Sequence, residues 1–267
     1  MKYVRFSGAL ILLLLVLLAA CQPAPASPTT QSLANTPTAQ AVSSSDEGSA
    51  SSTNVPVTQP ASTPASDEDP LASIVNAFSG QPQSAGNVLV LYGQVLDSNG
   101  SPLEGATVEI WQTDYQGIYD HPNDPRTSNR DPNFQSYGSV TTDANGLYSF
   151  RTIIPAAYEN RPPHIHVKVK VGGTTLLTTQ FYFVDAQSQN ASDAIFSQLG
   201  AAAENVLLTP TDFTDAAGNA VLVAQKDIVV AAGQGAGSLT LTPSQTEGPY
   251  YPVVPVENYD NDLTIKN

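Results

Sequence analysis

Hydrophobic and polar residues alternate along several short stretches in the second two-thirds of the chain, as they do in half-buried β-strands. The pattern predicts strands over residues 88–96, 106–111, 139–142, 147–152, 165–171, 174–184 and 221–230. Turns rich in Asp, Asn and Gly separate them, so we expect two hairpins, 139–152 and 165–184. Helix is predicted only over Ser192–Ala203, with a short helical turn at Leu71–Phe78. These elements predict an all-β fold, an antiparallel β-sandwich.

The N-terminal end of the chain has the pattern of an export signal. Lys2 and Arg5 precede an apolar run over residues 9–20, which is too short and wrongly flanked for a membrane span. The run ends in residues 18–21, Leu-Ala-Ala-Cys, which resemble the bacterial lipobox. The alternative is an ordinary secretory signal with an incidental cysteine. We expect residues 1–20 to be a lipoprotein signal peptide and Cys21 to carry a lipid anchor, which predicts an extracytoplasmic, membrane-anchored lipoprotein of the bacterial cell envelope.

Composition divides the remainder into two parts. Residues 21–87 consist mostly of Ser, Thr, Pro, Ala and Gln, which cannot bury enough apolar surface to fold, so we expect a disordered linker. Residues 88–267 are long enough for one packed domain. Cys21 is the only cysteine, which excludes an internal disulfide and a cysteine-based zinc cluster. The net charge of −14 argues against nucleic acid as a partner.

Two histidines share the most specific local pattern in the chain, the sequence Arg-Pro-Pro-His-Ile-His-Val-Lys-Val of residues 161–169. Side chains alternate along a strand, so His164 and His166 lie on one face while Ile165 and Val167 lie on the other. The two prolines before His164 cannot donate to a β-ladder, so the strand should begin there. Two imidazoles on one face at a strand end can bind the same metal ion.

A metal site needs further ligands, and the residues alone leave two sets open. His121 would complete a three-histidine zinc or copper site with His164 and His166. Tyr119 and Tyr158 are the other candidates. A free phenol has a pKa near ~10, so a phenolate ligand requires a strong Lewis acid such as ferric iron.

Four segments together resemble the intradiol ring-cleavage dioxygenases, in particular the protocatechuate 3,4-dioxygenase-like branch. They are Glu-Ile-Trp-Gln at 109–112, Gly-Ile-Tyr at 117–119, Thr-Asp-Ala-Asn-Gly-Leu-Tyr-Ser-Phe-Arg-Thr at 142–152 and Arg-Pro-Pro-His-Ile-His at 161–166. The resemblance implies that the sandwich is of the intradiol dioxygenase type. It also implies an enzyme that cleaves a catechol-type ring, protocatechuate or catechol, between its two hydroxylated carbons with O2.

The same resemblance implies roles for individual residues. Tyr119, Tyr158, His164 and His166 would bind one Fe(3+) ion. Arg161 would stabilise negative charge on the substrate and Gln180 would help to shape the pocket. Tyr158 would be the phenolate that leaves the metal when the substrate binds.

One segment departs from the family order. Residues 242–251, Thr-Pro-Ser-Gln-Thr-Glu-Gly-Pro-Tyr-Tyr, resemble a motif that these enzymes carry before the first sandwich strand, but here it follows the last strand. A circular permutation would explain this and would place Asn267 near Val88. Docking onto a neighbouring subunit and a local turn are the alternatives, so oligomerisation stays open. The remaining alternative for the whole domain is a non-catalytic extracytoplasmic sandwich that binds a glycan or a protein.

Overall fold

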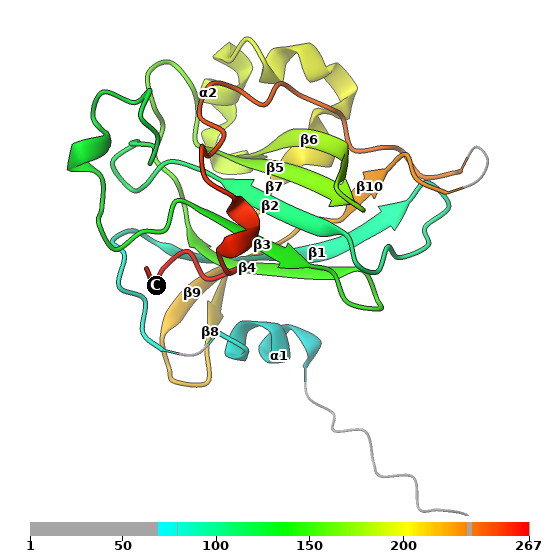
Figure 1. Ribbon diagram of the computed structural model, residues 1–267, viewed down its shortest axis with the longest axis horizontal. Coiled ribbons are helices and arrows are strands. Elements are labelled where there is room, and N and C mark those ends of the chain that lie inside the picture. Colours follow the sequence, from blue (N-terminus) through cyan, green and yellow to red (C-terminus); the bar gives the residue numbers. More distant parts are fainter. Residues whose placement is uncertain (1–68, 79, 234–236, 267) are drawn as a thin grey trace, which may run out of the picture. The chain divides into compact units, whose positions relative to one another are not determined.

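Two five-stranded sheets face each other in the computed structural model, which describes residues 69–78, 80–233 and 237–266 (Figure 1). The first sheet contains β1 (Val88–Asp97), β4 (Leu147–Ile153), β8 (Thr211–Thr214), β9 (Ala220–Gln225) and β10 (Ile228–Val230). The second has the order β3 (Tyr137–Thr141), β2 (Thr107–Trp111), β5 (His164–Val171), β6 (Thr174–Phe183) and β7 (Leu207–Leu208). The helices are α1 (Pro70–Asn76), α2 (Gln187–Ser192) and four 3-10 segments: η1 (Thr127–Asn129), η2 (Val184–Ala186), η3 (Phe196–Val206) and η4 (Val256–Asn258).

Alternate residues of both sheets form a single core between them. Leu91 and Phe150 come from the first sheet, and Ile110, Ile165 and Phe181 from the second, and all five are fully buried. Burying each such side chain contributes about 1.5–3 kcal/mol, so this core holds the domain without a disulfide. The predicted all-β sandwich is therefore confirmed.

Strand pairing differs from the prediction in two respects. The sheets are mixed rather than antiparallel, because β1 pairs in parallel with β9 and β10, and β6 pairs in parallel with β7. The hairpin predicted over residues 139–152 is wrong: β3 pairs with β2, whereas β4 pairs with β1 in the other sheet. Alternation shows that a strand has a buried face but does not encode its partner. The β5–β6 hairpin is confirmed, with its turn at Gly172 and Gly173.

The predicted strand over residues 221–230 is divided into β9 and β10. The break falls at Lys226, whose N–H donates to Tyr92 O and whose carbonyl accepts from the Tyr148 hydroxyl. A Cβ at Gly93 would lie 2.0 Å from the Lys226 oxygen, so glycine is required for the chain to cross β1 this closely. Both halves then pair with β1, β9 before Gly93 and β10 after it.

The helical predictions are confirmed in part. The turn expected at residues 71–78 is α1, but residues 192–203 do not form one helix. Ser192 ends α2, and η3 is interrupted at Gly200, where φ is +55°.

The folded part also begins before Val88, within residues predicted as linker. Val75 of α1 is buried against Val90 and Val223, on the outer face of the first sheet. Apolar positions in α1 therefore cover a second apolar face of β1.

The predicted signal peptide, Cys21 and residues 21–68 of the predicted linker lie outside the described residues. Within the described ranges, no helix is long and apolar enough to cross a membrane.

Candidate metal centre

Strand β5 presents the two histidines as the sequence predicts. It begins at His164, and Ile165, Val167 and Val169 point into the core between the sheets. His164 and His166 occupy the alternate positions, on the outer face of the second sheet. Trp111 of β2 pairs with His166 of β5, and the two rings stack with centroids 4.7 Å apart and planes 10° apart. The partners across β6 are Tyr182 for His164 and Gln180 for His166, so one row of side chains forms the floor of the site.

A tight loop brings Tyr119 to this floor. The buried carboxylate of Asp114 accepts hydrogen bonds from the N–H groups of Gln116 and Ile118 and holds the loop closed. Gly117 has φ +76°, and a Cβ there would lie 2.3 Å from the carbonyl oxygen of Ala157. The loop can therefore approach the segment that carries Tyr158.

The far side of the loop is fixed by a second carboxylate. Asp124 accepts from the Tyr119 N–H at 3.0 Å and forms a salt bridge with Arg126, which also donates to Gly117 O. Burial alone would raise the pKa of Asp124, but the hydrogen bonds from Tyr119 and Arg126 outweigh it and lower that pKa. The charged carboxylate thus anchors the backbone at Tyr119 itself.

The four predicted ligands converge in the folded chain. The Tyr119 hydroxyl oxygen lies 3.1 Å from Nε2 of His166 and 3.4 Å from Nε2 of His164. The Tyr158 ring centroid is 5.1 Å from that of Tyr119 and 5.7 Å from that of His164. All four are buried, with exposed fractions of 2% for Tyr119, 7% for Tyr158, 2% for His164 and 1% for His166.

The donor atoms in this cluster fit a bound cation better than they fit one another. His164 Nδ1 lies 2.7 Å from Pro162 O, so it carries the proton and Nε2 presents a lone pair to the centre. The Tyr119 hydroxyl has one proton, so it can donate to only one of the two Nε2 atoms that face it. Burial lowers the pKa of His164 to about 3 and that of His166 well below its usual value, so both rings are neutral. Burial also raises the pKa of Tyr119, so an ionised phenol there requires a strong cation.

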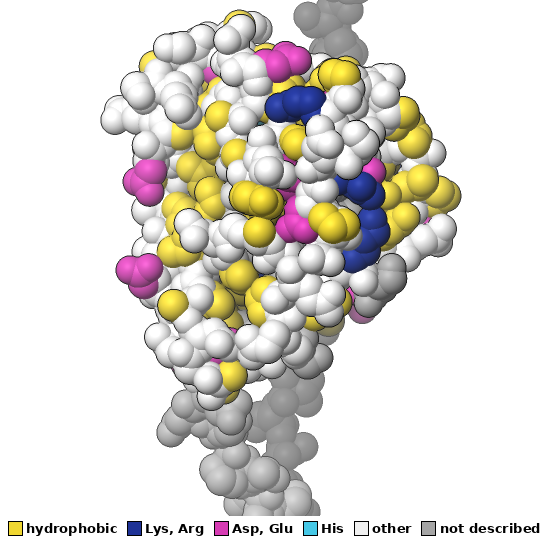
Figure 2. All heavy atoms as spheres, turned by 90° about the vertical axis from the view of Figure 1, so that its left-hand side faces the viewer, with side chains coloured by type: hydrophobic (Ala, Val, Ile, Leu, Met, Phe, Trp, Pro, Cys, Tyr) yellow, Lys and Arg dark blue, Asp and Glu magenta, His cyan; other side chains and the backbone are white. Residues whose placement is uncertain are grey.

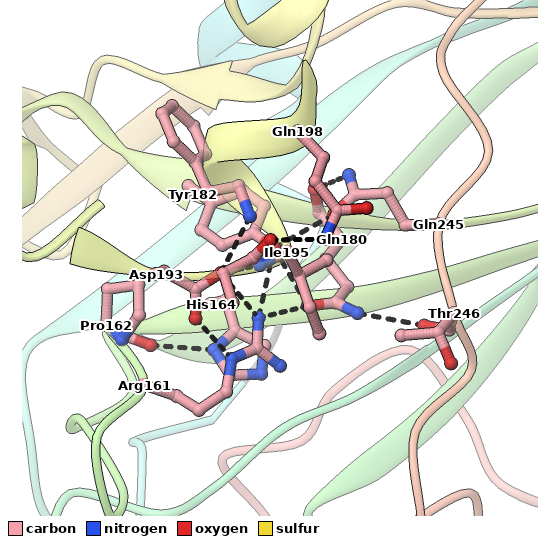
Figure 3. A network of polar contacts seen from close by, with 12 residues as sticks. Arg161, Pro162, His164, Gln180, Tyr182, Asp193, Ile195, Gln198, Gln245 and Thr246 are labelled. Carbon is pink, nitrogen blue, oxygen red and sulfur yellow. Dashed lines mark hydrogen bonds and ion pairs between the residues drawn. The ribbon is translucent and has the colours of Figure 1, made fainter. Parts of the chain in front are cut away.

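Arg161 sits beside this cluster in a network shown in Figure 3. The turn at residues 158–161 is closed by a hydrogen bond from Arg161 N to Tyr158 O at 2.9 Å. The guanidinium donates to Asp193 at 2.6 Å, to Gln180 Oε1 at 2.7 Å and to the Tyr182 hydroxyl at 3.1 Å. Burial alone would lower the pKa of Arg161, but the hydrogen bond and charge of Asp193 raise it. Arg161 is therefore a fixed positive charge next to Tyr158.

The C-terminal segment, residues 242–251, covers the site within the same chain and appears in orange to red in Figure 1. Gln180 Nε2 donates to Thr246 O at 2.8 Å, and Glu247 forms a 2.5 Å salt bridge with Lys168 of β5. Tyr250 stacks on Tyr119, with ring centroids 4.5 Å apart. Downstream, Thr264 O accepts from the N–H groups of residues 83 and 84, shortly before β1. The segment thus lies over the site within the same chain. Asn267, which the permutation account places near Val88, lies outside the described residues.

The three-histidine alternative is wrong. His121 Nδ1 accepts from the Asn123 N–H at 3.0 Å, and its ring packs against Tyr250 at 5.7 Å. No three His, Cys, Asp or Glu side chains in the described part of the chain could hold a metal ion together.

Several residues of the site were missed from the sequence. Tyr182 follows Gln180 by two positions on a strand, so alternation could have placed it on the same face. Asp193 is the second residue of the predicted helix, but in the structure it precedes η3 and accepts from the N–H groups of Ile195 and Phe196. Nothing in the local pattern links Asp193 to Arg161, or Asp124 to Tyr119.

Comparisons with known proteins point in one direction. A family model described as a dioxygenase matches residues 64–232. The catechol 1,2-dioxygenase of Acinetobacter baylyi is 38% identical over 113 residues, which cover 36% of this chain and 35% of that protein. The protocatechuate 3,4-dioxygenase beta chain of Burkholderia cepacia is 38% identical over 133 residues, covering 46% of this chain and 56% of that one. The matched regions thus span about a third to a little over half of these relatives.

Among solved structures, the dioxygenase domain of a carbohydrate-binding fusion protein from Streptomyces sp. SirexAA-E is 28% identical. It covers 58% of this chain and 86% of that one, with a TM-score of 0.46. The catechol 1,2-dioxygenase from Acinetobacter sp. ADP1 is also 28% identical, with coverages of 54% and 52% and a TM-score of 0.44.

Proposed function

Since this chain belongs to the intradiol ring-cleavage dioxygenase family, we propose that it opens a catechol-type ring between its two hydroxylated carbons with O2, using Fe(3+) held by Tyr119, Tyr158, His164 and His166. The observation that carries the proposal is the convergence of the Tyr119 oxygen with Nε2 of both histidines, at 3.1 and 3.4 Å. Two phenols and two neutral imidazoles are a donor set that suits a hard trivalent ion.

When bound, the ferric ion would hold the phenols ionised and withdraw electron density from the bound diol, which activates the ring toward oxygen. The chain fixes the orientation of the ligands. The Pro162 carbonyl sets the tautomer of His164, and stacking on Trp111 sets the plane of the His166 ring. Asp124 anchors Tyr119 through its backbone.

Tyr158 is the group that we expect to move a proton. Burial raises its pKa, and the charge of Arg161 and a hydrogen bond with it offset only part of that rise. A phenolate at Tyr158 can therefore accept a proton from a substrate hydroxyl at its own oxygen, with Arg161 balancing the charge. Arg161 in turn stabilises negative charge on the substrate, because Asp193 and Gln180 hold its guanidinium in place.

We further propose that the enzyme acts outside the cytoplasm, anchored by a lipid on Cys21, and that residues 242–251 take the place of the family's N-terminal motif by circular permutation. Support for the first comes from the sequence of residues 1–21, and for the second from the docking of residues 246–251 over the site. Metabolic labelling with a radioactive fatty acid should label the wild-type protein but not Cys21→Ser. Labelling of the variant would contradict the proposal that Cys21 carries the lipid.

Oxygen consumption by the purified protein across a panel of catechols tests the activity. We expect uptake with at least one catechol and loss of more than about a hundredfold in Tyr119→Phe and His164→Ala, since each removes a ligand. Unchanged uptake in both variants would contradict the ligand assignment. His121→Ala serves as the matched control, because the side-chain contacts of His121 within the described residues are with Asn123 of its own loop and with the Tyr250 ring.

A further inference from the structure

One buried lysine contacts both ends of the chain segment that covers the predicted metal ligands. The side chain of Lys168 is 7% exposed, and its ammonium forms a salt bridge with Glu247 at 2.5 Å. The same ammonium lies 3.3 Å from the centroid of the Tyr251 ring, in a cation–π contact. Residues 247–251 form a short loop, which we call the covering loop, and Lys168 therefore closes the base of that loop.

The middle of the covering loop lies against three of the four predicted ligands. Gly248 has φ +77°, and a Cβ there would lie 3.3 Å from Cε1 of the His166 ring. The Tyr250 ring stacks on Tyr119 at 4.5 Å and meets Tyr158 edge-to-face at 5.7 Å. The position of the loop therefore limits the space beside these ligands.

The burial of the Lys168 charge ties this residue to the loop. Lys168 follows His166 by two residues on β5, so both side chains lie on the outer face of the second sheet. A lysine on an outer face usually extends its ammonium into water, and a buried ammonium is costly unless it is paired. Among the described residues, Glu247 is the only acid that forms a salt bridge with it. Similar grouping occurs on the face shown in Figure 2, where basic side chains lie beside acidic and hydrophobic ones.

Further contacts fix the orientation of the Tyr251 ring. Its hydroxyl donates to Glu109 at 2.8 Å, and the same carboxylate accepts from Lys170 at 2.5 Å. The Tyr251 ring also meets the Trp111 ring edge-to-face, with centroids 5.0 Å apart. The ring therefore presents its face to Lys168 in a defined position.

Resting on the proposed function, we propose that Lys168 is a positioning residue for catechol binding, which holds the covering loop over the metal ligands. Loss of its charge would release both ends of the loop and widen the space beside the ligands. The four predicted ligands and Arg161 would remain, so catechol binding should weaken more than turnover slows. The Glu247 side chain is 45% exposed, so salt should screen its part of the clamp.

Oxygen uptake by the full-length protein with catechol gives the first test. Lys168→Met keeps most of the apolar stem but removes the charge, and should raise KM about 3- to 10-fold while kcat changes less than about 2-fold. Glu247→Gln breaks only one of the two contacts and should raise KM about 2- to 3-fold. High salt should raise the wild-type KM toward that of Glu247→Gln. Glu104→Gln is the matched control, because Glu104 is exposed and precedes the end of β2 opposite Trp111.

The only tryptophan of the chain reports the position of the loop without turnover. Trp111 is 1% exposed and lies against Tyr251, so acrylamide should quench its fluorescence weakly in wild type. The Stern–Volmer constant should rise about 2-fold or more in Lys168→Met, since the loop opens locally. It should rise less in Glu247→Gln and stay at the wild-type value in Glu104→Gln. An effect of Glu247→Gln must pass through the loop, because that substitution leaves Lys168 and both rings unchanged.

Two results would overturn the inference while leaving the dioxygenase intact. One is unchanged quenching in both Lys168→Met and Glu247→Gln, and the other is a KM in both that equals the KM of Glu104→Gln. If Lys168→Met does not fold, Glu247→Gln decides alone, because that side chain is partly exposed. Absence of oxygen uptake by wild type with every catechol would instead overturn the proposed function, and the role of Lys168 in catechol binding with it.

Discussion

The ring of Tyr250 stacks on the ring of Tyr119, with centroids 4.5 Å apart and planes 20° apart. Tyr250 also meets Tyr158 edge-to-face at 5.7 Å. The C-terminal segment thus packs against both predicted tyrosine ligands, so a residue near the end of the chain contacts the candidate metal centre.

From this stacking we predict that Tyr250→Ala lowers activity but does not release the iron. An aromatic pair contributes about 0.5–1.5 kcal/mol beyond the buried area, so we expect kcat/KM to fall about 2- to 10-fold while the iron content stays at the wild-type level. Oxygen uptake and metal analysis on the same sample measure both. Tyr115→Ala is the control, because Tyr115 is 44% exposed. Equal losses in the two variants would argue against a specific role for the stack.

We predict that the addition of a single methyl group at Gly117 impairs the site more than the loss of the Tyr250 ring does. A methyl group there meets the Ala157 carbonyl at 2.3 Å and must push the Tyr119 loop away from Tyr158. We expect Gly117→Ala to lose most of its iron and to lower the free energy of unfolding by about 1–3 kcal/mol.

Gly105→Ala is the matched control for that variant. Gly105 has nearly the same φ, +74° against +76°, but nothing lies within 4 Å of its added Cβ. Both variants incur the backbone strain, and only Gly117→Ala incurs the clash. Normal iron loading in Gly117→Ala would show that the loop's approach to residue 157 does not shape the site.

Gln180 joins Arg161 to the C-terminal segment, because its oxygen accepts from Arg161 and its nitrogen donates to Thr246 O. Gln180→Ala removes the hydrogen-bond partner of both the Arg161 guanidinium and the Thr246 carbonyl at a buried position. We expect a loss of about 1–3 kcal/mol in urea unfolding and increased proteolysis within residues 242–251. Gln198→Ala, which changes an exposed glutamine, should do neither. A protected segment in Gln180→Ala would mean that its other contacts, such as Lys168 with Glu247 and Thr179 with the Pro243 carbonyl, are sufficient to hold it.

Asp193 predicts how stability changes in acid. Burial would raise its pKa, but hydrogen bonds from Arg161 and from the Phe196 and Ile195 N–H groups outweigh it, so the folded-state pKa lies below 3.8. A group with a lowered pKa stabilises the fold above its unfolded-state pKa, and this contribution is lost as pH falls through the folded value. Asp193→Asn should therefore be less stable than wild type at pH 7, and the difference should begin to shrink below about pH 4 and disappear below the folded-state pKa. A difference that is constant with pH would refute the charge-based role.

The sequence was sufficient for most of the strands and for the histidine face, because both rest on alternation along one segment, but it did not predict β7, β8 or the break between β9 and β10. His164 and His166 follow from a period of two, and Ile165 and Val167 on the opposite face fix their direction. The start of β5 at His164 could also be predicted locally, from the two prolines that precede it.

Pairing and long-range contacts could not be predicted in this way. β3 and β4 look like a hairpin in sequence, yet each pairs in a different sheet, because partner choice depends on packing across the core. Asp193 and Asp124 look like ordinary loop acids, and only the fold brings them to Arg161 and Tyr119. The tyrosines came from the family resemblance, since neither has a local pattern that marks it as a ligand.

The central claim is that Tyr119, Tyr158, His164 and His166 bind one ferric ion. Metal analysis combined with the visible absorption spectrum tests it most directly, because a phenolate bound to ferric iron absorbs visible light whereas a zinc site is colourless. The account predicts about one iron per chain and a coloured wild-type protein. The band should change in both Tyr119→Phe and Tyr158→Phe. A colourless protein that retains zinc after purification, or an iron spectrum that neither tyrosine variant alters, would contradict it.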